Sequence, residues 1–569
     1  MQRREEPMPH VRWQQARPEP DPNFAPATPR CFRRFAIGSS LATRLLSSQP
    51  MSTYPPTRRQ FAAALGAAAS AGAQSPRRPN IVFVCSDQHS FKYAGCAGHP
   101  LVKTPNLDRI ADRGVVFDNA YCGSPVCAPG RACMMTGLYP HQTNSFCNST
   151  VWDGSQPTWG TRLRRAGYHT EATGKFDLNP DFDIGFEEHA TRHGHRSGPD
   201  ITSLFRSPVA YRTGERGLVN GRARDTPHAD AERARTCVEF IRDKAPRLGT
   251  PWCYYVGFTA PHPAFVAMRK YWDMYPRERV DLPSVTAEYL ESQHLMFQEL
   301  RHFKRIATPI SERRIRNARA GYYGLVTELD EHIGQIWSAL EENGELERTV
   351  FVYTSDHGEA LGEHGLWLKN NLLEPAAHVP LVIAGPGVPR GRRVAHATSH
   401  VDLVQSLLEW SGSGGGSEIK GHSLIPLMRG DDSGHPGWAY SESHSEGNAT
   451  GSFMIRRGPW KYIHFTWYED LLFNLEEDPG ELHDRSRDPE AQNVLRELRD
   501  ILEDEVSPEA VTRAGFETQE RMLAGLASEL GEQGLATMLQ GRLGAGLAQV
   551  LAARAVRDLA RRSGSERRA

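Results

Sequence analysis

The stretch TVFVYTSDHGEALGEHG, residues 349–365, decides the fold. It opens with an apolar run, Val350 to Tyr353, whose length and β-branched and aromatic side chains are typical of a fully buried strand. Asp356 and His357 follow almost directly. We therefore expect a buried strand that delivers a carboxylate and an imidazole at its carboxyl end.

Two other stretches repeat this arrangement. NIVFVCSDQ (80–88) ends its apolar run at Asp87, and WCYYVGF (252–258) is followed by His262. Helical patterns such as TPNLDRIADRG (104–114) and GYYGLVTELDEHIGQIWSALEENG (321–344) lie between the strands. Strands that alternate with helices predict an α/β protein with a large, doubly wound, mostly parallel sheet flanked by helices. Ligands of such sheets bind at the carboxyl ends of the strands, so we expect these polar side chains to form one site.

The residue types at this predicted site favour a cation and an anionic ester. Asp87, Asp356 and His357 offer two carboxylates and an imidazole, which suit Ca²⁺, Mg²⁺ or Mn²⁺. Lys175 and Lys369 supply positive charge, and His262 supplies a proton donor or an anion contact. A divalent cation beside lysines and a histidine suits the hydrolysis of a sulfate or phosphate ester.

The composition excludes some other classes. The 569 residues include 67 basic and 68 acidic side chains, a net charge of -1, so the chain lacks the basic balance of a nucleic-acid-binding protein. No apolar run reaches the roughly 18 residues of a transmembrane helix. The nine cysteines are not spaced like a disulfide scaffold, and the sequence does not indicate which of them pair.

The N-terminal part is predicted to lie outside the catalytic fold. Residues 1–50, rich in Pro and Arg, are expected to be disordered and to be an extension of the gene model, with translation starting at Met51. In residues 51–73, Arg58 and Arg59 precede an Ala-rich run that closes in Ala71-Gly72-Ala73. This layout predicts a twin-arginine signal peptide, hence the twin-arginine translocase as a partner and a periplasmic or secreted protein.

The C-terminal part predicts a smaller α+β subdomain. Past SGSGGGSE (411–418), read as a surface loop, residues 453–481 alternate short apolar runs with turn residues. We assign 78–411 to the catalytic α/β domain, 430–506 to the subdomain and 507–569 to a helical tail. In the tail, every fourth residue from Leu535 to Leu551 is leucine, which favours a packing face, with an interfacial helix or an oligomer contact as the alternative.

The stretch CGSPVCAPGRACMMTG (122–137) carries a resemblance to a known family. Cys127 to Arg131, followed by Thr136 and Gly137, is similar to the C-x-P-x-R…TG signature of the formylglycine-dependent sulfatases of the alkaline phosphatase superfamily. RPNIVFVCSDQ (78–88) and TSDHGEALGEHGLW (354–367) resemble the two metal-binding strands of that family. The resemblance covers about residues 78 to 560. Within the family it is strongest to the arylsulfatase K branch, the glucuronate-2-sulfatases.

This resemblance implies a mechanism and roles for individual residues. A separate formylglycine-generating enzyme would oxidise Cys127 to formylglycine (3-oxoalanine), whose hydrate has two hydroxyls: one attacks sulfur, and the other expels sulfate afterwards. Arg131 would hold the modified side chain. Asp87, Cys127, Asp356 and His357 would bind the metal, usually Ca²⁺, with Mg²⁺ or Mn²⁺ as alternatives. The sulfate contacts would be Lys175, His262 and Lys369.

Two residues depart from the usual family pattern. Asp177 stands in GKFD (174–177) where many sulfatases have a histidine, and it would either orient Lys175 or act as a base. Gln88 stands where many relatives have a second aspartate, which lowers the negative charge of the metal site.

The sequence therefore favours an exported hydrolase of sulfate esters, acting on a sulfated small molecule or a uronic-acid-containing glycan. Two alternatives stay open. One is a phosphonate or phosphodiester hydrolase of the same superfamily. The other is a non-catalytic protein that binds sulfated glycans.

Overall fold

The computed structural model describes residues 78–193, 201–204, 215–414, 418–444 and 447–566. The predicted extension 1–50 and the predicted signal peptide 51–73 lie outside these residues, as does part of the loop at 411–418. Within them, no helix is long and apolar enough to cross a membrane.

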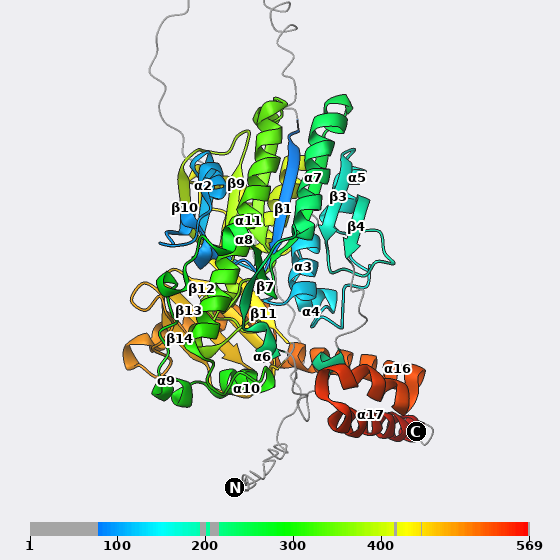
Figure 1. Cartoon of the computed structure of the whole chain (residues 1–569). Coiled ribbons are helices and arrows are strands. Elements are labelled where there is room, and N and C mark those ends of the chain that lie inside the picture. The colour runs from blue at the N-terminus through cyan, green and yellow to red at the C-terminus, as the bar shows by residue number, and fades with distance from the viewer. Residues whose placement is uncertain (1–77, 194–200, 205–214, 415–417, 445–446, 567–569) are drawn as a thin grey trace, which may run out of the picture. The chain divides into compact units, whose positions relative to one another are not determined.

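The centre of the molecule is an eight-stranded sheet with the order β10-β2-β9-β8-β1-β6-β3-β4 (Figure 1). The three strands predicted from apolar runs, β8, β1 and β6, lie side by side in its middle and are parallel. Among the described strands of this sheet, only β9 runs against its neighbours. The prediction of a large, mostly parallel sheet is therefore confirmed. The strands are β1 Asn80–Asp87, β2 Gly114–Tyr121, β3 His169–Lys175, β4 Glu187–His193, β6 Trp252–Pro261, β8 Thr349–Ser355, β9 Leu381–Ala384 and β10 Arg392–Ser399.

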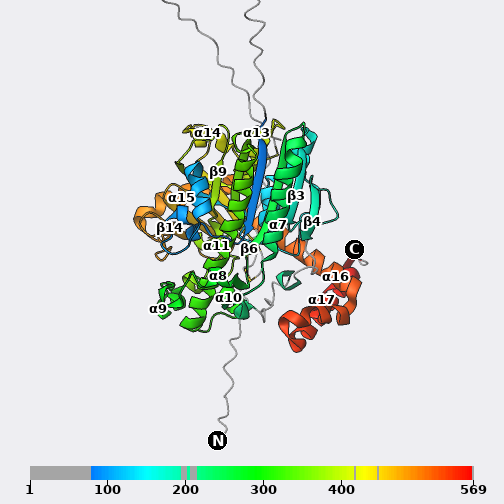
Figure 2. The ribbon, with the colours of Figure 1, turned by 45° about the horizontal axis from the view of Figure 1, so that its top comes forward.

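Helices cover both faces of this sheet. On one face pack α2 (Pro105–Asp112), α7 (Ala229–Glu239) and α11 (Glu312–Glu342), and in both views α7 and α11 lie in front of the strands (Figures 1 and 2). The other face holds α3 (Cys127–Thr136), α5 (Trp159–Arg165) and α13 (His400–Ser411). Successive side chains of a strand point to opposite faces, so β1 sends Val82 and Val84 into one core, and Ile81 and Phe83 into the other.

The C-terminal part forms a second, antiparallel sheet, as the alternation of apolar runs and turns predicts. Its strands are β11 Trp438–Ser443, β12 Ser452–Arg457, β13 Trp460–Phe465 and β14 Leu471–Asn474. Helix α15 (Gln492–Glu505) packs on it through Leu495, Leu498 and Leu502. These elements fall within the predicted subdomain 430–506, whose boundaries stay a prediction.

The predicted leucine stripe lies in a helical hairpin. Helix α16 (Pro508–Leu543) is kinked at Gly531, which has a φ of 64°, and Gly544, with a φ of 79°, separates it from α17 (Ala545–Glu566). Leu535, Leu539 and Leu551 are buried between the two helices together with Leu204, the last residue of a short 3-10 helix (Ile201–Leu204). The stripe is thus a packing face.

The remaining elements are short helices and one small sheet. The two-stranded sheet pairs β5 (Gly221–Arg224) with β7 (Phe265–Met268). The helices are α4 Pro140–Thr143, α6 Glu215–Leu218, α8 Arg269–Trp272, α9 Ala287–Ser292, α10 Leu295–Phe303, α12 Glu374–Ala377 and α14 Leu424–Arg429.

Phe83 should be a main contributor to the stability of the sheet. It is fully buried, with ring centroids 5.4 Å from Trp159 and 5.7 Å from Tyr255. Phe83→Ala should lower the free energy of unfolding by about 3–5 kcal/mol, because a cavity replaces the ring. Phe182→Ala, at a side chain that is 40% exposed, should cost no more than about 1 kcal/mol. Urea unfolding of the two variants measures both values, and equal losses would contradict this assignment of the core.

Candidate active site

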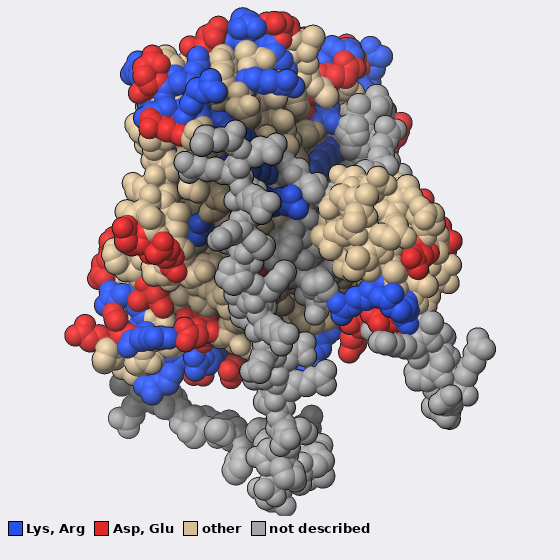
Figure 3. Space-filling model, turned by 60° about the horizontal axis from the view of Figure 1, so that its bottom comes forward, with Lys and Arg blue, Asp and Glu red and all other residues tan. Residues whose placement is uncertain are grey.

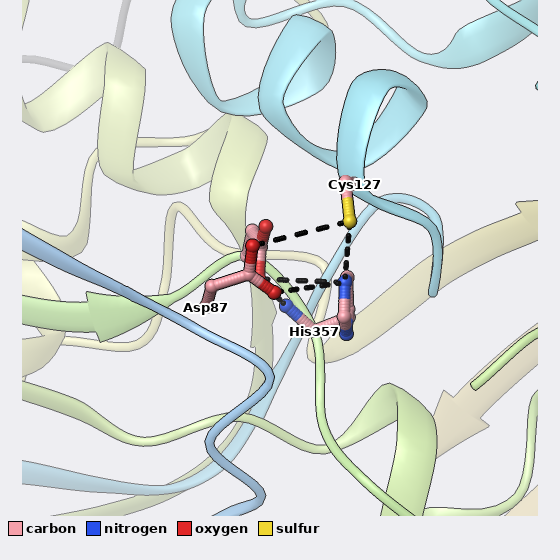
Figure 4. A group of neighbouring side chains, drawn as sticks. Asp87, Cys127 and His357 are labelled. Carbon is pink, nitrogen blue, oxygen red and sulfur yellow. Dashed lines mark hydrogen bonds and ion pairs between the residues drawn. The ribbon is translucent and has the colours of Figure 1, made fainter. Parts of the chain in front are cut away.

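The paired strands β1 and β8 bring the predicted metal ligands together. Ser86 pairs with Ser355 in the parallel register, so Asp87 and Asp356 follow at the same edge of the sheet. Both carboxylates and the imidazole of His357 are fully buried. Figure 4 shows Cys127 above them, at the first residue of α3, with its sulfur directed at Asp87 and His357. These side chains therefore lie together at the carboxyl ends of the strands, where the sequence predicts the site.

Cys127 is close to each of these groups. Its Sγ lies 3.4 Å from Nε2 of His357 and 4.0 Å from Oδ2 of Asp87. One ligand atom each from Asp87, Cys127, Asp356 and His357 lies within 4.8 Å of the others. Such a cluster is compact enough to surround a single cation.

Gly130 allows α3 to approach the end of β8 this closely. A Cβ at this position would lie 2.7 Å from the carbonyl oxygen of Ser124 and 3.0 Å from that of Asp356. The first contact is too short for a methyl group and the second is very tight, so a larger residue would push α3 away. The glycine of the C-x-P-x-R stretch thus helps to set the position of Cys127.

Arg131 neutralises the buried carboxylates. Its Nε donates to Oδ2 of Asp356 at 2.8 Å, and its Nη2 lies 3.8 Å from Oδ2 of Asp87. Nη1 donates to the carbonyl of Lys175 at 2.7 Å and to the hydroxyl of Tyr255 at 3.0 Å. The guanidinium therefore faces the predicted metal ligands and the end of β3, and the expected hold on residue 127 stays a prediction.

Two lysines complete the charged centre. Lys369 Nζ lies 2.7 Å from Sγ of Cys127 and 3.0 Å from Oε1 of Gln88. Lys175, at the end of β3, forms an ion pair with Asp87, and its Nζ is 2.9 Å from Oδ2 of Asp177. Asp177 thus contacts Lys175, which is the geometry needed to orient that ammonium.

His262 lies farther out. It follows β6, and its half-buried imidazole bonds the carbonyl of Pro263 through Nδ1 at 2.7 Å. It is nevertheless one of the groups that lower the pKa of Asp87. Figure 3 shows the face at which the strands end, where Lys and Arg side chains are visible within a central hollow.

The charges of the site shift its pKa values. Burial alone would raise the pKa of Asp87, but Lys175, His262, Lys369 and His357 hold it well below its usual value. Burial and Asp87 raise the pKa of the Cys127 thiol, yet Lys175, Lys369 and His357 outweigh them and lower it to about 5. Elsewhere, burial raises the pKa of Cys85 to about 12. The centre therefore stabilises negative charge on residue 127, unlike the core around Cys85.

The sequence prediction does not include Glu359. The side-chain amide of Gln88, a residue noted in the sequence only for its missing charge, joins Lys369 to the buried carboxylate of Glu359. Glu359 also accepts hydrogen bonds from the backbone of Leu361 and Leu368. A signal was present, since Glu359 lies two residues past His357, but an acidic residue in a loop is usually solvated.

Comparisons with known proteins identify the family of the chain. The sequence model of the sulfatase family matches residues 79–413, and that of the N-sulphoglucosamine sulphohydrolase C-terminal region matches 362–507. A choline-sulfatase of Rhizobium meliloti (strain 1021) is 32% identical, over 78% of this chain and 90% of its own. Arylsulfatase K of Xenopus laevis is 31% identical, over 75% of this chain and 84% of its own.

Solved structures point to the same fold. The phosphonate monoester hydrolase of Agrobacterium radiobacter superposes with a TM-score of 0.63 and 26% identity, over 75% of this chain and 95% of that protein. This fold is the alkaline phosphatase-like α/β fold that the sequence predicts. Because the family model covers more than half of the residues, the chain belongs to the sulfatase family.

Proposed function

We propose that the chain hydrolyses sulfate esters with a formylglycine made from Cys127 and a divalent cation held by Asp87, residue 127, Asp356 and His357. The observation that supports this most is the buried four-residue cluster with two lysines beside it. Membership of the sulfatase family makes the chain a sulfuric ester hydrolase. The formylglycine, the ion and the substrate are the proposed parts.

The residues present fit a divalent cation. Oδ1 of Asp87 is buried and has no hydrogen-bond partner among the described residues, which suits an atom that binds a metal. Two carboxylates and one imidazole are ligands for Ca²⁺ or Mn²⁺. Such an ion would withdraw charge from the bound ester. Nδ1 of His357 is bonded to the carbonyl of Gly358 at 3.0 Å, which leaves Nε2 for the ligand position.

The chain itself supplies positive charge for the sulfate group. Lys369 is buried, Lys175 is nearly so, and both ammonium groups lie beside the four-residue cluster. Residue 127 opens the ten-residue helix α3, whose N-terminus also favours an anion. Charge that develops on the sulfate oxygens would therefore meet fixed donors rather than water.

Two further residues, Asp177 and His262, are given roles in positioning and proton transfer. Asp177 holds the Lys175 ammonium in place, and His262 at the rim would protonate the leaving oxygen.

For the substrate we propose a sulfated uronic-acid-containing glycan, supported by the likeness to arylsulfatase K. A phosphonate monoester is the second candidate, since a solved hydrolase of that class shares the fold.

Export is a separate proposal. The twin-arginine signal rests on residues 51–73, which lie outside the described part of the chain. We propose that the formylglycine-generating enzyme acts on Cys127 before export, because this route carries folded proteins, and that the enzyme works in the periplasm or outside the cell.

A panel of four substrates separates the candidate functions. It contains p-nitrophenyl sulfate, a 2-O-sulfated glucuronate disaccharide, choline sulfate and a phenylphosphonate monoester. We expect kcat/KM to be highest for the disaccharide and lowest for the phosphonate, because the site is proposed to fit a sulfated uronic acid. A preference for the phosphonate would favour the second candidate. Binding of sulfated glycans without turnover of any ester would favour a non-catalytic protein.

A separate prediction concerns the modification of Cys127. A mass spectrum of the tryptic peptide that carries residue 127, from protein made in its native host, should show the aldehyde or its hydrate. Cys127→Ser should lower kcat by about 10³-fold or more, as losses of a nucleophile do. The control, Cys96→Ser at a half-buried thiol away from the site, should retain activity. An unmodified thiol in fully active enzyme would refute the mechanism.

Metal content gives a further prediction. Asp356→Asn removes one negative charge from the ion site, so it should lower both the bound metal per chain and kcat, the latter by about 10²–10³-fold. Inductively coupled plasma mass spectrometry measures the metal. Glu187→Gln serves as the control, because Glu187 belongs to a separate group with His169 and Glu171 where Lys244 already supplies a cation. Loss of metal in the control and not in Asp356→Asn would place the ion elsewhere.

A further inference from the structure

The loop that carries Lys369 has an unusual backbone. Leu368 and Asn370, on either side of Lys369, have φ angles of 67° and 79°. Residues with a Cβ adopt this left-handed region rarely, and it costs free energy. A loop with two such residues keeps its shape only if its surroundings hold it.

Four groups of the described residues outside this loop hold its backbone. Leu368 N donates to Oε1 of Glu359 at 2.6 Å, and the carbonyl of Leu368 accepts from Ala360 N at 2.8 Å. Asn370 N donates to the carbonyl of Pro125 at 3.1 Å, which ties the loop to the segment just before α3. The fourth group is the ammonium of Lys304, whose Nζ donates to the carbonyl of Trp367 at 2.9 Å and to that of Lys369 at 2.5 Å. One ammonium thus bonds the backbone on both sides of Leu368.

The burial of Lys304 marks this contact as specific. Its side chain, just past the end of α10, is completely inaccessible to solvent. A buried ammonium is costly unless its donors are bonded, and two of the acceptors here are carbonyls of a single loop. Lysine side chains are otherwise mostly exposed, so a merely structural filler at this place would be apolar.

We propose that Lys304 is a positioning residue for the reaction: it fixes the backbone of the Lys369 loop and thereby keeps the Lys369 ammonium on residue 127. This inference rests on the proposed function of Lys369. The distances that depend on it are those from Lys369 Nζ to Sγ of Cys127, 2.7 Å, and to Oε1 of Gln88, 3.0 Å. Neither the sequence pattern nor the family signature includes Lys304.

Lys304→Met is the direct test, since methionine has a similar length and no donors. Without the ammonium, the carbonyls of Trp367 and Lys369 lose a donor and the loop relaxes. A displacement of about 1 Å at a catalytic group can cost about 10²-fold in rate, so kcat should fall by that order. KM should change much less, because the substrate still meets Lys175 and the rest of the site.

A double-mutant cycle shows whether Lys304 acts through Lys369. Lys369→Met should lower kcat strongly by itself. Adding Lys304→Met to Lys369→Met should then lower kcat by less than about twofold, because residues that act through one group are not additive. Full additivity of the two losses would overturn the proposal, and so would a Lys304→Met enzyme with normal kcat.

Hydrogen exchange of the full-length protein provides a readout that does not depend on activity. In Lys304→Met, exchange should quicken in the peptide that spans residues 361–372 and stay unchanged in β1 and β8. The control, Lys270→Met, removes a surface ion pair with Glu331 and should alter neither exchange nor kcat. If Lys304→Met does not fold, Lys304→Gln replaces it, and unchanged exchange in residues 361–372 of either folded variant would refute the inference. An inactive wild-type chain, in contrast, would refute the proposed function. The exchange result would still show whether Lys304 holds the backbone of residues 361–372.

Discussion

Two buried carboxylates at adjacent strand ends are the constraint on which the rest of the structure depends. Asp87 and Asp356 lie at the ends of β1 and β8, and neither side chain is accessible to solvent. Carboxylates so close together repel one another and lose their hydration, so they stay ionised only where positive charge compensates them. Arg131 contacts both, Lys175 pairs with Asp87, and a cation bound between them would complete the compensation.

The positive charges that compensate the two carboxylates come from separate parts of the chain. Arg131 and residue 127 come from α3, Lys175 comes from the end of β3, and Lys369 comes from a loop that Glu359 and backbone contacts hold. Each element ends or begins at the same edge of the sheet, which is why an open parallel sheet suits such a site. The same fixed charges that stabilise the carboxylates would also favour the proposed sulfate group next to residue 127.

Much of this arrangement could be predicted from the sequence, and the reasons are local. Val350 to Tyr353 is apolar throughout, so the strand and its polar end are visible in one stretch. Cys127 is found differently, through the resemblance of its C-x-P-x-R stretch to the sulfatase signature. By contrast, the antiparallel direction of β9 depends on its neighbours β2 and β8. Lys304 could not be found either, since its partners are carbonyls of a distant loop and no side-chain pattern reports them.

The most direct test of the account is the position of the ion. Crystals of the full-length protein, loaded with Mn²⁺, can be measured for anomalous scattering at the manganese edge. The account predicts a peak among Asp87, Asp356, His357 and residue 127, at ordinary ligand distances of about 2.0–2.6 Å from the carboxylate oxygens. A map with no peak there, or with its only strong peak at another group of side chains, would contradict it.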